Sequence, residues 1–131
     1  MKKLLFFVLL FETLFAGEII WEKDWNKALE KAKNENLPIM MVVTGEHCGA
    51  CEWFHEVTFQ KETIIDEVSK NFVATTFDKN YLPIEYRAKG TPSTLFFTPK
   101  GKKIRYVAYG ALNYKKFLPI LQTISGKFRK E

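Results

Sequence analysis

The feature that most constrains how this chain folds is a pair of cysteines placed directly after a long apolar run. Residues 38–44 read Pro-Ile-Met-Met-Val-Val-Thr, and a continuous apolar stretch of this length is typical of a strand buried on both faces of a sheet. Residues 45–47, Gly-Glu-His, predict a turn, and a helix is expected to begin at about Cys48. Residues 48–51, Cys-Gly-Ala-Cys, therefore lie where a buried strand passes into a helix.

The rest of the chain alternates predicted helices with predicted strands. Helical spacing of apolar residues, with Asp24 and Asn113 as N-caps, predicts helices over residues 25–33, 48–57, 62–69 and 113–125. Apolar, branched and aromatic runs predict strands over residues 38–44, 72–77, 93–98 and 103–109, the last two forming an antiparallel hairpin. The inner helix faces are expected to carry Trp53, Phe54, Val57, Ile64, Ile65 and Val68. We therefore predict an α/β fold with a central mixed β-sheet flanked by helices.

Residues 1–17 have the three parts of a secretory signal peptide. Lys2 and Lys3 form a charged start, residues 4–11 are an unbroken apolar run, and small residues follow up to Gly17. The apolar run is shorter than the roughly 20 residues that span a bilayer. We expect cleavage after residue 16 or 17, export to a bacterial periplasm, membrane contact only during export, and one mature domain over residues 18–131. The alternatives are an N-terminal core strand or an uncleaved anchor.

The charge of the chain bears on the class of partner. There are 20 Lys and Arg against 15 Asp and Glu, which gives a formal net charge of +5. Much of the excess lies in residues 100–130. We interpret it as a solvated, weakly cationic surface that favours acidic partners, and we expect no nucleic-acid partner.

The spacing of the two cysteines indicates chemistry and not structural support. A bridge between Cys48 and Cys51 closes a very short loop, so it stabilises the fold little. At a helix N-terminus the unpaired N–H groups and the dipole favour a thiolate, which makes Cys48 the predicted nucleophile. Cys51 lies one turn into the helix and is the predicted resolving thiol. Gly49 and Ala50 between them are small and leave room for a substrate chain.

Four motifs together resemble the thioredoxin family, over about residues 21–124. They are Cys48-Gly49-Ala50-Cys51, Gly90-Thr91-Pro92 in the cis-proline position, Phe96-Phe97 with Lys100-Gly101-Lys102, and Tyr109-Gly110-Ala111-Leu112 before the last helix. Residues 51–59 are most similar to an exported subgroup. That subgroup includes the C-terminal domain of the DsbD reductases and the thioredoxins associated with sulfur oxidation.

The resemblance implies an enzyme that cycles between dithiol and disulfide and passes electrons to partner proteins. It implies that Thr91 and a cis Pro92 face the cysteines, and that the backbone of Thr91 pairs with a substrate peptide. The substrate-binding residues implied or expected are His47, Gly49, Ala50, Thr91, Pro92 and Gly110. The expected partners are protein disulfides and a membrane electron donor of the DsbD type. We expect no cofactor.

Three positions depart from the family pattern. Thioredoxins usually carry Trp before the first cysteine, where this chain has His47, and the dipeptide between the cysteines is Gly-Ala in place of Gly-Pro. The buried Asp that thioredoxins place six residues before the first cysteine is Val42 here. That Asp is thought to help move the proton of the resolving thiol, so water, Glu46 or Glu52 would have to substitute.

Two other functions fit the same residues. Cys48, Cys51 and His55 are spaced i, i+3 and i+7, and with His47 they could hold copper or zinc in a periplasmic metal-handling protein. A redox-inert binding module with a structural bridge is the third reading. Haem attachment is excluded because Glu52, and not His, follows the second cysteine.

Overall fold

The computed structural model describes residues 17–129, and a mixed five-stranded sheet lies at its centre. The strands run in the order β1-β3-β2-β4-β5. Their bounds are Trp21–Glu22 for β1, Ile39–Thr44 for β2, Val73–Asp78 for β3, Ser93–Phe97 for β4 and Lys103–Tyr109 for β5. Strands β1, β3 and β2 are parallel, whereas β4 is antiparallel to β2 and β5 is antiparallel to β4. The predicted fold class is confirmed.

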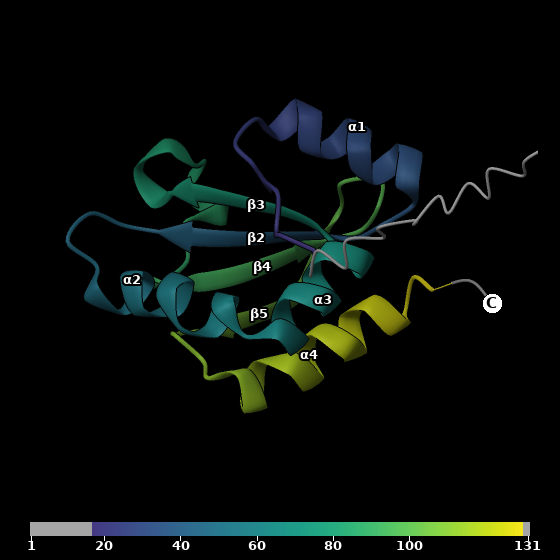
Figure 1. Ribbon diagram of the computed structural model, residues 1–131. Helices are drawn as coiled ribbons and strands as arrows, with labels where there is room; N and C mark the ends of the chain where they lie inside the picture. Colours follow the sequence, from purple (N-terminus) through teal and green to yellow (C-terminus); the bar gives the residue numbers. More distant parts are fainter. Residues whose placement is uncertain (1–16, 130–131) are drawn as a thin grey trace, which may run out of the picture.

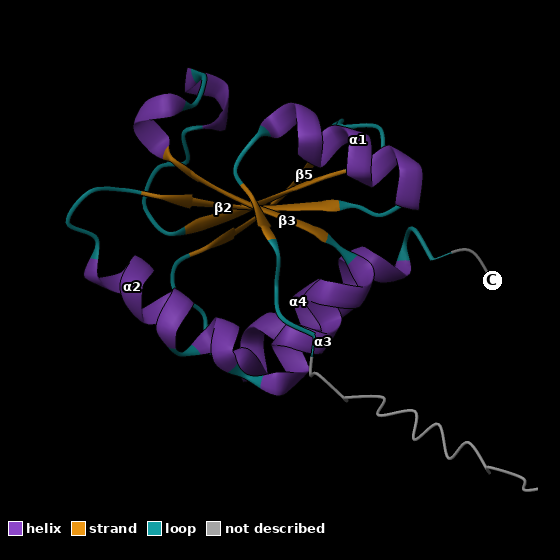
Figure 2. Ribbon diagram, turned by 45° about the horizontal axis from the view of Figure 1, so that its top comes forward, coloured by secondary structure: helices purple, strands orange, loops and turns teal. Residues whose placement is uncertain are grey.

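Helices cover both faces of this sheet. They are α1 (Trp25–Glu35), α2 (Gly49–Glu56), α3 (Glu62–Asn71) and α4 (Tyr114–Gly126), with short 3-10 turns at Thr58–Gln60, Lys79–Tyr81 and Ile84–Tyr86. Figure 1 and Figure 2 show α1 on one face and α2, α3 and α4 on the other. No helix within residues 17–129 has the length and apolar character needed to cross a bilayer. The predicted signal peptide falls almost wholly outside the described residues, so its cleavage stays a prediction.

Strand β2 is buried on both faces from Ile39 to Val43, and these five residues are all apolar. Met40 and Val42 belong to the core cluster beneath α2, α3 and α4. Ile39, Met41 and Val43 belong to the cluster on the side of α1. Full burial of such a side chain contributes about 1.5–3 kcal/mol to stability. The site that follows β2 is therefore carried by a strand that is anchored in both core clusters.

The two predicted N-caps are present. The Asp24 side chain accepts a hydrogen bond from the backbone N–H of Lys27 at 3.0 Å, and the Asn113 side chain accepts one from that of Lys116 at 3.1 Å. Each bond satisfies one of the N–H groups that the first turn of a helix leaves unpaired. Both helices begin where the sequence predicts.

Two features of the fold differ from the prediction. Strand β1 was missed because two residues are too few to show an alternating pattern. Trp53 and Val57 were expected inside but are 42% and 38% exposed. The inner face of α2 is formed by Cys51 and Phe54, which are three residues apart and lie one above the other. Trp53 lies about 100° further round the helix from Phe54, so it faces outward.

Candidate active site

The turn after β2 places Cys48 immediately before the first residue of α2. His47 has a positive φ of 51°, and Cys48 is extended, with φ −101°, so it is the N-cap of the helix. The Cys48 sulfur accepts a hydrogen bond from the backbone N–H of Cys51 at 3.1 Å. The predicted position of the first cysteine at a helix N-terminus is therefore observed.

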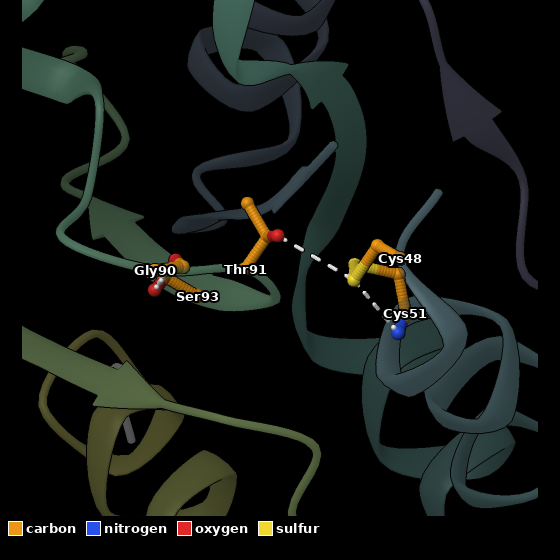
Figure 3. Close-up of a disulfide and its surroundings, with 5 residues drawn as sticks. All are labelled: Cys48, Cys51, Gly90, Thr91 and Ser93. Carbon is orange, nitrogen blue, oxygen red and sulfur yellow. Dashed lines mark hydrogen bonds between the residues drawn. A yellow bond between two sulfur atoms is a disulfide. The ribbon is translucent and has the colours of Figure 1, made fainter. Parts of the chain in front are cut away.

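Cys48 and Cys51 are joined by a disulfide, with their Cα atoms 5.2 Å apart (Figure 3). They are the only cysteines in the sequence. Their environments differ, because Cys51 is only 5% exposed whereas Cys48 is half-buried. Gly49 and Ala50 between them are exposed, as is His47. An incoming group therefore meets the Cys48 side of the bridge first.

Thr91 reaches the disulfide from the segment before β4. Its hydroxyl donates to the Cys48 sulfur at 3.4 Å, across the gap visible in Figure 3. The Thr91–Pro92 peptide bond is cis. The Ser93 hydroxyl donates to the carbonyl of Gly90 at 2.6 Å, which holds this turn together. Thr91 thus faces the first cysteine, as the motif implied.

Gly110 supports the same turn from the end of β5. Its backbone N–H donates to the carbonyl of Pro92 at 2.9 Å. Its φ of 86° lies in the left-handed region, which favours glycine. Pro92 itself is buried. Gly110 therefore bonds to the backbone of Pro92, and no hydrogen bond among the described residues joins it to the Cys48 sulfur.

Gly45 is a site residue that sequence reasoning treated only as part of a turn. A Cβ atom at this position would lie 3.1 Å from the Thr91 hydroxyl oxygen and 3.7 Å from Cε of Lys79. The first of these contacts is tighter than ordinary van der Waals packing. The signal that could have found it is a glycine at the very end of the buried strand, where a neighbouring backbone must approach closely.

An open hollow of about 380 Å³ lies beside the disulfide. It brings together the two cysteines, both histidines and several polar side chains. Its lining residues are Thr44, Gly45, His47, Cys48, Cys51, Glu52, His55, Glu56 and Thr76. Of the groups expected to move a proton, Glu52 borders this hollow and Glu46 does not line it.

His55 is held in this hollow by two aromatic rings. Its ring packs edge to face on Trp21 at 5.1 Å and lies tilted against Phe59 at 5.5 Å, measured between ring centroids. Burial lowers the pKa of His55 below its ordinary value of 6.5. Trp21 belongs to β1, the strand that the sequence did not predict, so the setting of His55 was not foreseen either.

The position of the missing acidic residue is apolar and fully buried. Val42 pairs with Thr76 of β3 on one side and with Thr94 of β4 on the other. The hydroxyl of Thr94 is buried and has no hydrogen-bond partner among the described residues. Residue 42 therefore supplies no carboxylate, and the residues paired with it on β3 and β4 carry hydroxyl groups.

The described residues offer no cluster of ligands for the metal-binding alternative. Within residues 17–129, no group of three or more His, Cys, Asp or Glu side chains is arranged to hold a metal ion. Both cysteine sulfurs are bonded to each other. The His55 ring packs against aromatic rings, and His47 lies exposed in the turn.

A disulfide at the N-terminus of the helix that follows the central strand, with the Thr91 hydroxyl facing its first sulfur, defines a thioredoxin-type thiol–disulfide oxidoreductase. The chain belongs to the thioredoxin-like domain family, whose model matches residues 25–125. The resemblance predicted from the four motifs is confirmed.

Solved structures share this fold. A thioredoxin from Thermus thermophilus is 22% identical, with a TM-score of 0.73, and the match covers 84% of this chain and 89% of that one. The oxidised DsbD C-terminal domain of Neisseria meningitidis is 14% identical, with a TM-score of 0.59, and the match covers 79% of this chain and 98% of that one. At these identities the likeness concerns the fold.

A curated relative matches one part of the chain. Spermatogenesis-associated protein 20 of Rattus norvegicus is 36% identical over 64 residues, which is 46% of this chain. The match spans only 8% of the length of that relative.

Proposed function

We propose that this protein is an exported reductant of disulfides in partner proteins, with Cys48 as the attacking thiol and Cys51 as the resolving thiol. The observation that carries the assignment is the unequal exposure of the pair. Cys51 is 5% exposed, whereas Cys48 is half-buried at the N-cap of α2. A bulky protein disulfide can therefore approach Cys48 but not Cys51.

The reaction runs in two exchanges. The Cys48 thiolate attacks one sulfur of the substrate disulfide, which forms a mixed disulfide and releases the other substrate sulfur as a thiolate. Cys51, as its thiolate, then attacks the Cys48 sulfur, so the internal bridge forms and the second substrate sulfur leaves. The substrate gains two electrons and the enzyme loses them.

Groups around Cys48 favour its thiolate and leave space for the substrate. The backbone N–H of Cys51, at the N-terminus of α2, and the Thr91 hydroxyl both donate hydrogen bonds to the Cys48 sulfur. His47, Gly49 and Ala50 are exposed around it and would contact the substrate chain. In this proposal the Thr91 backbone pairs with that chain, and Pro92 and Gly110 keep the turn in place.

The direction of electron flow follows from what surrounds the bridge. The loop between the cysteines has no side-chain donor, and the acidic Glu46 and Glu52 flank it. Both features disfavour a thiolate, so they favour the disulfide form and hence a reducing protein. In an oxidising compartment such a protein needs an electron supply, and we propose a membrane reductase of the DsbD type. The signal-peptide pattern of residues 1–17 supports export to a periplasm.

Trapping of substrates tests the roles of the cysteines. Cys51→Ala should accumulate mixed disulfides with partner proteins, because the first exchange proceeds and the second cannot. Cys48→Ala should trap none. Non-reducing electrophoresis after rapid acid quenching measures both, with the double variant as the blank. Equal trapping by the two single variants would show that the roles are wrongly assigned.

A further inference from the structure

We propose that His55 accepts the proton of Cys51, through water in the hollow beside the disulfide, when Cys51 attacks the mixed disulfide. The inference rests on the proposed roles of the two cysteines. It adds a residue that none of the four family motifs singles out for this task, and it supplies the proton acceptor that Val42 cannot provide.

The first support is placement. His55 follows Cys51 by four residues on α2, and side chains at this spacing share one helix face, with Cβ atoms about 5–6 Å apart. Both residues line the same hollow of about 380 Å³. That volume holds several water molecules at roughly 30 Å³ each, and the hydroxyl of Thr76 in its wall gives them a polar partner.

The position and protonation of the His55 imidazole also support the proposal. Trp21 and Phe59 hold the ring in place against the wall of the hollow. Burial lowers the pKa of His55, so the ring is neutral at neutral pH and able to take a proton. The segments packed against it contribute these two aromatic rings and the Gln60 amide, which donates to the His55 carbonyl at 3.1 Å. The charged or titratable groups that share its hollow are Glu52 and Glu56 of the same helix and His47 of the turn.

The third support is the need for an acceptor. Cys51 is 5% exposed, so bulk water has little access to its thiol. A thiol in such a setting attacks only after it loses its proton. His47, Glu52 and Glu56 are exposed to solvent, whereas His55 is half-buried on the side toward the core. An imidazole also suits proton transfer at neutral pH better than a carboxylate does.

Proton transfer to His55 accompanies the attack of Cys51 on the mixed disulfide. The Cys51 S–H proton passes to a water molecule, which gives a proton to the neutral His55 ring. The Cys51 sulfur forms the bond to the Cys48 sulfur, the bond from Cys48 to the substrate sulfur breaks, and the substrate sulfur leaves with the electron pair. The imidazolium afterwards returns its proton to the departing thiolate or to solvent.

The chromogenic disulfide DTNB separates the two exchanges in one stopped-flow trace. The reduced protein releases a first equivalent of coloured thiolate when Cys48 attacks and a second when Cys51 attacks. His55→Phe keeps an aromatic ring against Trp21 and Phe59 but cannot take a proton. We expect the first phase to be unchanged and the second to slow about 100-fold at neutral pH. The defect should shrink as pH rises, because hydroxide takes the proton instead.

Glu56→Gln is the matched control, since Glu56 lines the same hollow one residue further along. It should leave both phases unchanged. His55→Gln, which hydrogen-bonds but accepts no proton, should reproduce the slow second phase, and it decides the question if the Phe variant does not fold. A second phase with wild-type rate and pH profile in either folded His55 variant would overturn the proposal, as would an equal loss in Glu56→Gln. An error in the proposed cysteine roles would give a different result. The first phase of the DTNB reaction would then persist in Cys48→Ala.

Discussion

Thr91 can approach the Cys48 sulfur because residue 45 has no side chain. The space that a Cβ would need at Gly45 is taken by the Thr91 hydroxyl, 3.1 Å away. That hydroxyl in turn donates to the Cys48 sulfur at 3.4 Å. The environment of the attacking sulfur therefore depends on two other residues, Gly45 and Thr91, from separate segments of the chain.

Thr91→Val should make Cys48 less reactive, because it removes the hydroxyl donor and keeps the shape of the side chain. A hydrogen bond to a charged group contributes about 1.5–3 kcal/mol. A sulfur acceptor at 3.4 Å should give less, and we expect a roughly fivefold slower alkylation of the reduced protein by iodoacetamide at neutral pH. Gly45→Ala should act in the same direction by displacing Thr91.

Thr123→Val is the control for this prediction. Its hydroxyl bonds within α4, to the carbonyl of Pro119 at 2.8 Å, far along the chain from the site. It should leave the alkylation rate of Cys48 unchanged. An unchanged rate in Thr91→Val as well would mean that the hydroxyl does not act on the sulfur.

His55 should also make stability depend on pH, independently of catalysis. Burial lowers its pKa in the folded protein, so in the window between that value and the ordinary 6.5 the unfolded chain binds more protons. Its contribution to stability is complete above pH 6.5 and is lost as pH falls toward the folded value. Urea unfolding at a series of pH values should show wild type losing more stability on acidification than His55→Phe. Parallel pH profiles for the two proteins would contradict this origin.

At the scale of elements, local patterns predicted the helices best. Asp24 and Asn113 cap α1 and α4 as expected, because an N-cap is a bond within one turn and is visible in local sequence. Strand β1 and the outward position of Trp53 were not predictable in the same way. Strand β1 exists only through its pairing with β3, which is distant in sequence. The side of α2 that turns inward likewise depends on the sheet and helices against which α2 packs.

Asn113→Ala should destabilise the protein by about 1 kcal/mol, the usual cost of losing an N-cap. The cap starts α4, whose Phe117 and Leu121 are fully buried in the core beneath the sheet. The midpoint of urea unfolding should fall with an unchanged dependence on urea concentration. Asn113→Ser should recover most of the loss because serine also caps. A similar loss in both variants would show that the cap bond is not the cause.

At the scale of the whole molecule, the sheet order assembles the site. Strands β2 and β4 are antiparallel neighbours, with Val43 opposite Ser93, so the end of one lies beside the start of the other. This pairing brings Cys48 and Thr91 together although they are 43 residues apart in sequence. The sequence patterns identified each segment, but only the likeness to a known family implied that the two segments meet. The hollow beside the disulfide was not predicted at all, because its walls come from β2, β3 and α2 together.

The reduction potential of the whole protein tests the proposed direction of electron flow. A strong oxidant such as DsbA owes its potential to a stabilised reduced form. Here the stabilising groups at Cys48 are a helix N-terminus and one neutral hydroxyl, while Glu46 and Glu52 oppose a thiolate. The potential should therefore lie nearer to the value of about −270 mV for thioredoxin than to that of about −120 mV for DsbA. A low potential means that folding favours the disulfide over the dithiol. The oxidised protein should therefore unfold at a higher temperature than the reduced protein. Equilibration with glutathione and paired melting curves measure the two quantities, and a reduced form that melts higher than the oxidised form would refute the reductant function.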